Sequence, residues 1–234
     1  MNNMSAYIMY YVMGIVVLPA FIFALICQAS VKSNYNKYSR IMSRSGMSGA
    51  DAAYRLLQLN GVTDVNIARV SGNLTDHYDP AKKTIFLSDG VYSSCSIAAI
   101  GIACHEAGHA CQHANGYFAL SVRNFVIPVT QIGSTLGVPI CFIGLFIHSE
   151  TIAYAGIVLY AFVAIFQLIT LPVEFNASRR ALETIKSNHF LIDEEYSGAK
   201  KVLTAAALTY VAALATALAT LLRLILVVNG GRRR

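Results

Sequence analysis

Four long stretches without a charged side chain dominate this sequence. They cover residues 6–31, 124–149, 151–173 and 202–222. As a helix, each stretch is long enough to cross a hydrocarbon core of about 30 Å, because an α-helix rises about 1.5 Å per residue. Only 13% of all residues are charged, whereas soluble domains carry about a quarter. The sequence therefore predicts an α-helical multi-pass membrane protein with about four transmembrane helices.

The apolar stretches divide the chain into segments. Residues 1–31 are expected to form a retained N-terminal anchor, because no basic residue precedes the apolar part and it is too long for a signal-peptide core. Residues 123–173 are expected to form a transmembrane hairpin with a very short turn. Residues 202–228 predict a fourth apolar helix, rich in small residues that allow helices to pack closely in lipid. A basic tail follows at 229–234.

Between the anchor and the hairpin, residues 32–122 predict a small α+β region. Residues 48–61 have helical spacing between a start and a stop signal. Over 62–87, short alternating runs are separated by turn signals, including one at Asp79-Pro80, which predicts two or three short strands. From about residue 94 to 114 the chain is small and apolar and predicts a helix.

The basic residues predict an orientation. They cluster at 32–44, 179–186, 200–201 and 232–234, all beside apolar runs. Lys and Arg in such positions mark the cytosolic side of a membrane. We therefore expect the α+β region and the segment 174–201 on that side. The net charge of +6 is then explained by contact with the lipid bilayer and not by binding of nucleic acid. The tail is in conflict, since four spans place it outside; either the last run stops short of crossing or the tail is an exception.

The predicted helix over 94–114 carries the segment His105-Glu106-Ala107-Gly108-His109. Two histidines at i and i+4 project from one helix face about one turn apart, so both imidazoles can bind one tetrahedral Zn²⁺. Glu106 lies about 100° around the helix, where it can reach a water on the metal without binding the metal itself. The segment predicts one zinc ion per chain, held by His105 and His109, with Glu106 as catalytic base and acid.

A catalytic zinc needs a third protein ligand and one open position. The metzincin extension is excluded, because Gln112 and Asn115 stand where that class has a glycine and a histidine. His113 is expected on the surface or supporting the site. Glu174 is the favoured ligand, as the first acid after an uncharged run, at the end of the third span. The less favoured alternatives are Glu183, Asp193, Glu194 and Glu195.

These residues carry a resemblance to a known family. The segments 74–80, 105–110, 171–180 and 205–212 resemble the YugP-like bacterial neutral zinc membrane metallopeptidases. The resemblance covers essentially the whole chain. The resemblance implies a zincin-like domain at the cytosolic face of the bacterial inner membrane, similar in architecture to the HtpX and CAAX-prenyl gluzincin-type peptidases. It also implies Glu174 as third zinc ligand.

In those relatives a residue about one turn after the glutamate supports the first histidine. Ser178 stands at the matching position and is not an acid, so Asn176 could share the role. The strand around His77 and Tyr78 is either a plain hairpin or an edge strand that pairs with an extended peptide, in which case one of these two side chains could contact the oxyanion. Arg179 is an orientation charge or a site for a substrate carboxylate.

The sequence predicts a zinc metalloendopeptidase that hydrolyses peptide or membrane-protein substrates near the cytosolic membrane face. Two alternatives stay open. A site-2-type intramembrane protease would take an Asp from a later span as third ligand, and no Asp occurs between Asp89 and Asp193. A non-catalytic membrane scaffold or chaperone with a structural zinc would not need Glu106.

Overall fold

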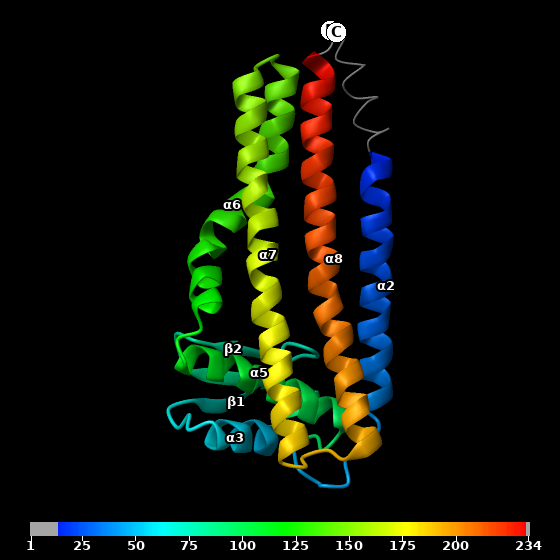
Figure 1. Cartoon of the computed structure of the whole chain (residues 1–234), viewed down its shortest axis with the longest axis vertical. Helices are drawn as coiled ribbons and strands as arrows, with labels where there is room; N and C mark the ends of the chain where they lie inside the picture. Colours follow the sequence, from blue (N-terminus) through cyan, green and yellow to red (C-terminus); the bar gives the residue numbers. More distant parts are fainter. Residues whose placement is uncertain (1–13, 233–234) are drawn as a thin grey trace. The chain divides into compact units, whose positions relative to one another are not determined.

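The computed structural model describes residues 14–232 (Figure 1). The first thirteen residues of the predicted anchor and the last two of the basic tail lie outside the described residues. The helices are α2 (Gly14–Tyr38), α3 (Gly49–Leu59), α4 (Asp89–Tyr92), α5 (Ile97–Ala114), α6 (Phe118–Phe146), α7 (Glu150–Ser187) and α8 (Asp193–Arg232). The strands are β1 (Asn66–Val70), β2 (His77–Asp79) and β3 (Thr84–Ser88).

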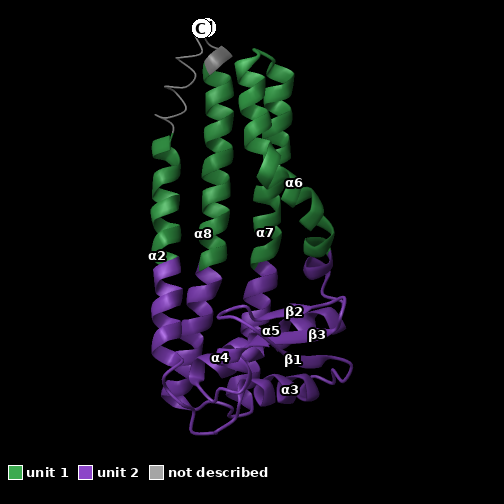
Figure 2. Cartoon of the chain, turned by 180° about the vertical axis from the view of Figure 1, so that it is seen from behind, with its two compact units in different colours: residues 1–27, 122–171, 209–234 green, residues 28–121, 172–208 purple. Residues whose placement is uncertain are grey.

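The chain divides into two compact units, coloured separately in Figure 2. Unit 1 consists of Met1–Cys27, Val122–Leu171 and Thr209–Arg234. Unit 2 consists of Gln28–Ser121 and Pro172–Leu208. Helices α2, α6, α7 and α8 each contribute residues to both units. Each unit is therefore assembled from pieces that are distant in sequence.

In the part of the chain that the structure describes, four helices, α2, α6, α7 and α8, are long and apolar enough to cross a membrane. The prediction of four such helices is confirmed. Two of them extend beyond the uncharged runs, since α7 continues to Ser187 and α8 already begins at Asp193. The reason is that a charged residue marks where an apolar surface ends and does not itself end a helix. The predicted segment 174–201 is thus largely helical.

Within unit 1, α6 and α7 approach closely through glycine. A Cβ atom at Gly133, Gly137 or Gly144 of α6 would collide with α7, and one at Gly156 of α7 would collide with α6. Small residues of this kind let helix backbones come together where apolar burial gives no driving force. Beside them, Cys141, Ala153 and Ile157 form a buried cluster with Leu224 and Val228 of α8.

Unit 2 holds a three-stranded sheet in the order β1-β3-β2. Strand β1 pairs with β3 in parallel, and β2 pairs with β3 antiparallel, with Tyr78 opposite Ile85 and His77 opposite Phe86. The predicted strands are confirmed, including the hairpin around Asp79-Pro80. Because β2 has β3 on one side only, it is an edge strand.

The core of unit 2 lies between the sheet and two helices. Ile85 and Leu87 of β3 are fully buried, together with Leu56 and Leu57 of α3 and Ile100 of α5. Helix α5 begins at an N-cap, Ser96, whose side chain accepts a hydrogen bond from the Ala99 backbone. The core therefore fixes one face of α5 and leaves the opposite face to meet α7.

Gly108 sets the distance between α5 and α7 within unit 2. A Cβ atom at this position would lie 2.7 Å from the Ala177 carbonyl oxygen, which is closer than real Cβ contacts allow. The absence of a side chain brings the backbones of the two helices together one turn after Glu174 and beside His109. A glycine that costs about 1 kcal/mol of helix propensity relative to alanine thus has a packing reason here.

Candidate metal centre

His105 and His109 of α5 meet Glu174 of α7 in a buried cluster. The Glu174 Oε2 atom lies 3.3 Å from His105 Nε2 and 3.5 Å from His109 Nε2. The Glu174 side chain is only 4% exposed, against 16% for His105 and 10% for His109. Ligand atoms of all three residues lie within 4.8 Å of one another. Among the residues described, this group has the composition and spacing to hold a metal ion.

The distances fit a tetrahedral zinc site. Two ligand atoms that each lie about 2.0–2.1 Å from a tetrahedral metal are about 3.3–3.4 Å apart. The two Nε2–Oε2 separations, 3.3 and 3.5 Å, match this edge length. Two imidazole nitrogens and one carboxylate oxygen form a donor set of catalytic zinc, which leaves a fourth position open. The residues present therefore fit the metal.

Each histidine also has a hydrogen-bond partner on its other ring nitrogen. His105 Nδ1 lies 3.1 Å from Ser178 Oγ, and His109 Nδ1 lies 3.0 Å from Gln112 Oε1. Such contacts orient a metal-binding imidazole and leave Nε2 directed at the metal position. The structure thus brings Ser178 beside the first histidine. It brings Asn176 to Gln112, whose Nε2 donates to Asn176 Oδ1 over 3.0 Å.

Glu106 points into the same buried region. Glu106 is only 9% exposed, and this burial raises the pKa of its carboxyl group to about 7. The charge of the neighbouring His105 acts in the opposite direction and lowers the pKa in part. The backbone N–H of Tyr78, on the edge strand β2, lies close enough to the Glu106 carboxylate to favour its charged form and so lowers its pKa slightly. A carboxyl group with a pKa near neutral can both accept and release a proton at that pH.

The two candidates on β2 face opposite ways. Residues opposite each other in neighbouring strands share a face of the sheet, so Tyr78 lies on the face of buried Ile85, towards α5. Its hydroxyl lies 2.8 Å from His113 Nδ1. His77 lies on the other face, where its ring stacks on Phe86. The structure therefore brings Tyr78, and not the His77 side chain, to the side of the metal helix.

Arg179 and Arg180 also differ in their surroundings. Arg179 is exposed, lies 3.8 Å from Glu183, and lines a cavity of about 490 Å³ with Ser178 and other residues of α7 and α8. Arg180 instead donates from Nε to Asn176 Oδ1 over 2.8 Å. Of the two arginines, Arg179 is the one that lines the cavity beside Ser178.

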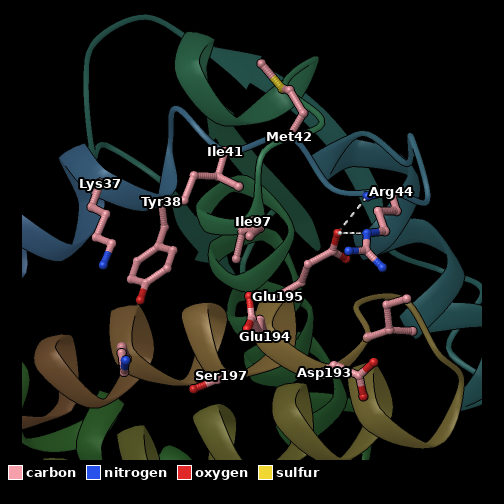
Figure 3. A pocket seen from close by; sticks show the side chains of 12 residues that line it. Lys37, Tyr38, Ile41, Met42, Arg44, Ile97, Asp193, Glu194, Glu195 and Ser197 are labelled. Atoms are coloured by element: carbon pink, nitrogen blue, oxygen red, sulfur yellow. Dashed lines mark hydrogen bonds and ion pairs between the residues drawn. The ribbon is translucent and has the colours of Figure 1, made fainter.

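The alternative acidic ligands lie elsewhere in unit 2. Asp193, Glu194 and Glu195 line a cavity of about 770 Å³ at the start of α8 (Figure 3). Glu195 accepts a hydrogen bond from the Arg44 backbone over 2.9 Å, as drawn in Figure 3. Among the described residues, the group that could hold a metal ion consists of His105, His109 and Glu174 and includes none of these acids, nor Glu183.

Gln112 is the residue of this site that sequence reasoning missed. In the sequence it only excludes a metzincin, but in the structure its side chain is fully buried and contacts His109, Val173 and Asn176. A signal was present, because Gln112 lies three residues after His109 on a helix whose remaining residues, apart from Glu106 and the histidines, are small or apolar. Its partners are more than sixty residues away in sequence, so the pattern alone did not reveal them.

The comparison with known proteins agrees with this geometry. A family described as "Putative neutral zinc metallopeptidase" matches residues 13–229, and the chain belongs to this family. A relative from Bacillus subtilis (strain 168), named "Putative membrane protease YugP", is 47% identical over 206 residues, which cover 88% of this chain and 91% of the relative. No solved structure matches the chain significantly. The resemblance inferred from the motifs is confirmed.

Proposed function

We propose that this protein is a membrane-embedded zinc metalloendopeptidase that hydrolyses peptide bonds of protein substrates near the cytosolic membrane face. The observation that carries the proposal is the buried group of His105, His109 and Glu174, beside Glu106, in which both Nε2–Oε2 separations match an edge of a zinc tetrahedron. Membership of a zinc metallopeptidase family and the similarity to a membrane protease support it.

His105, His109 and Glu174 would hold one zinc ion per chain, in the gluzincin manner. When bound, zinc lowers the pKa of water and polarises a carbonyl group. Glu106 accepts the proton of the attacking water and then delivers it to the leaving amine. Its burial raises the pKa of the carboxyl group, which favours its holding the proton between the two halves of this transfer.

Strand β2 is positioned to bind the substrate backbone. It is the edge strand of the sheet, and the Tyr78 backbone N–H lies close enough to the Glu106 carboxylate to favour its charged form. An extended peptide that pairs with this edge would run past the catalytic carboxylate, which is how β-strand addition aligns a peptide. The Tyr78 hydroxyl, close to His113, is a candidate contact for the oxyanion, and Arg179 for a substrate carboxylate.

The membrane arrangement follows from the four apolar helices and the basic clusters. We propose that α2, α6, α7 and α8 cross the bacterial inner membrane and that unit 2 faces the cytosol in a zincin-like arrangement. The third ligand of the proposed site is a Glu at the end of a predicted span and not an Asp within a span. This favours the proposed metalloendopeptidase over a site-2-type protease.

Cleavage assays test the proposal. Purified wild type, Glu106→Gln and Glu183→Gln are incubated with casein and with an unfolded membrane protein, and their zinc content is measured. Glu183 is the matched control, because it is an exposed acid on α7 outside the metal group. We expect cleavage by wild type and Glu183→Gln, and a loss of about 10²–10⁴-fold in Glu106→Gln at equal zinc content.

Equal cleavage by wild type and Glu106→Gln would contradict the proposal. So would the absence of cleavage by a zinc-loaded wild type, a result that would favour the scaffold or chaperone alternative.

A further inference from the structure

Gln112 joins the two helices that carry the metal-binding side chains. It lies on α5, three residues after His109, and is fully buried. Its Oε1 atom lies 3.0 Å from His109 Nδ1, while its Nε2 donates to the Val173 carbonyl over 2.8 Å and to Asn176 Oδ1 over 3.0 Å. Val173 and Asn176 flank Glu174 on α7. One amide therefore contacts a metal-binding histidine on α5 and two residues that flank Glu174 on α7.

The chemistry of the partners determines which way this amide points. A backbone carbonyl can only accept a hydrogen bond, so the Gln112 nitrogen must face Val173. Asn176 Oδ1 also accepts from Arg180 Nε over 2.8 Å, and a guanidinium can only donate. With both donors of the Gln112 nitrogen used, its oxygen is the atom that faces His109.

The orientation of Gln112 in turn determines the tautomer of His109. An amide oxygen can only accept, so His109 Nδ1 must carry the proton. His109 Nε2 then keeps its lone pair, 3.5 Å from Glu174 Oε2, where a metal ligand is required. Ser178 cannot do the same for His105, because a hydroxyl either donates or accepts.

We propose that the chain of hydrogen bonds Arg180–Asn176–Gln112–His109 positions the site. It sets the tautomer of His109 and holds His109 Nε2 opposite Glu174 Oε2. The inference rests on the proposed function, since it concerns how the same site binds zinc. It identifies Gln112 as a positioning residue, with no contact to substrate.

The polarity of each link makes the proposal specific. A primary carboxamide at position 112 supplies one acceptor and two donors, which is what His109 and the two α7 oxygens require. A carboxylate there would face two acceptors and could donate to neither. At position 176 the requirement is reversed, because the oxygen of Asn176 only accepts from Gln112 and Arg180. A carboxylate at 176 can do this as well.

The experiment measures zinc affinity by competition with a chelator in full-length protein. The variants are Gln112→Glu, Gln112→Met, Asn176→Asp and Asn176→Leu, and the melting temperature of each zinc-free protein reports folding. We expect zinc to bind about 10–100-fold more weakly in Gln112→Glu, Gln112→Met and Asn176→Leu, as for the loss of partners that orient metal ligands. Asn176→Asp is expected to recover the affinity that Asn176→Leu loses.

Wild-type affinity in Gln112→Met would overturn the proposal. So would an equal loss in Gln112→Glu and Asn176→Asp, because a residue that merely fills space would not distinguish acceptors from donors. If the Gln112 variants do not fold, the contrast between Asn176→Asp and Asn176→Leu decides alone. If only this inference fails, wild type still cleaves casein and still depends on Glu106. If the proposed function fails, either wild type does not cleave casein or Glu106→Gln cleaves it equally well.

Discussion

His105 and His109 present the same ring nitrogen to Glu174, but their other nitrogens have partners of different kinds. The amide of Gln112 imposes one tautomer on His109, while the Ser178 hydroxyl near His105 can adapt to either. Glu174 completes the group from another helix, at distances that match the edges of a zinc tetrahedron. At the scale of single residues, Glu174 therefore decides whether two histidines become a three-ligand site.

Replacement of Glu174 tests this role. Glu174→Gln keeps the size of the side chain but replaces an anionic oxygen with a neutral amide, which is a much weaker zinc ligand. We expect the variant to lose its zinc on dialysis against a chelator that leaves wild type loaded, and to lose peptidase activity with it. Metal analysis after dialysis provides the measurement.

Glu183→Gln serves as the control, since this acid is exposed and lies two turns further along α7. Retention of a full equivalent of zinc by Glu174→Gln would show that another residue supplies the third ligand.

At the scale of elements, the close approach of α5 and α7 aligns the donor set. Gly108 permits this approach, because a Cβ atom there would meet the Ala177 carbonyl oxygen. Strand β2 approaches α5 from the sheet, where the Tyr78 backbone contacts Glu106. The site is thus assembled by three elements of unit 2, none of which holds it alone.

Gly108→Ala is expected to separate the two helices. The added methyl group would overpack the contact at a cost of about 1–3 kcal/mol, so the zinc-free protein should melt at a lower temperature and bind zinc more weakly. Gly101→Ala is the matched control on the same helix, because its Cβ would meet the Ala199 Cβ at 3.4 Å, an ordinary contact. Thermal melting and chelator competition measure both effects.

If Gly108→Ala matched Gly101→Ala in melting temperature and zinc affinity, the spacing of α5 and α7 would not depend on Gly108.

Sequence reasoning predicted those elements whose patterns are local. The turn signal at Asp79-Pro80 predicted the hairpin, and the i, i+4 histidines predicted one face of α5. Alternation could not say which of His77 and Tyr78 faces α5, because it identifies two faces without saying which is buried. The contacts of Gln112 with α7 depend on tertiary packing across more than sixty residues and leave no local pattern.

At the scale of the whole molecule, four apolar helices and the basic clusters determine the proposed orientation. If all four helices span the membrane, we expect the turn between α6 and α7 on the periplasmic side. The basic tail is the exception to the charge rule under this arrangement.

Labelling of single cysteines tests the orientation. In a background with Cys95→Ser, an exposed residue of α3, Gln58, and one of the α6–α7 turn, His148, are replaced by cysteine in turn. We expect a membrane-impermeant maleimide to label His148→Cys in spheroplasts and Gln58→Cys only in inverted vesicles. Labelling of Gln58→Cys in intact spheroplasts would contradict a cytosolic unit 2.

The central claim is that His105, His109 and Glu174 bind one catalytic zinc ion, and it is tested most directly by locating that ion. A crystal or cryo-EM structure of the zinc-loaded Glu106→Gln protein, with anomalous scattering at the zinc edge in the crystal, would show the coordination. We predict zinc about 2.0–2.2 Å from Nε2 of both histidines and from a carboxylate oxygen of Glu174. Zinc bound elsewhere, or a Glu174 carboxylate more than about 3 Å from it, would contradict the account.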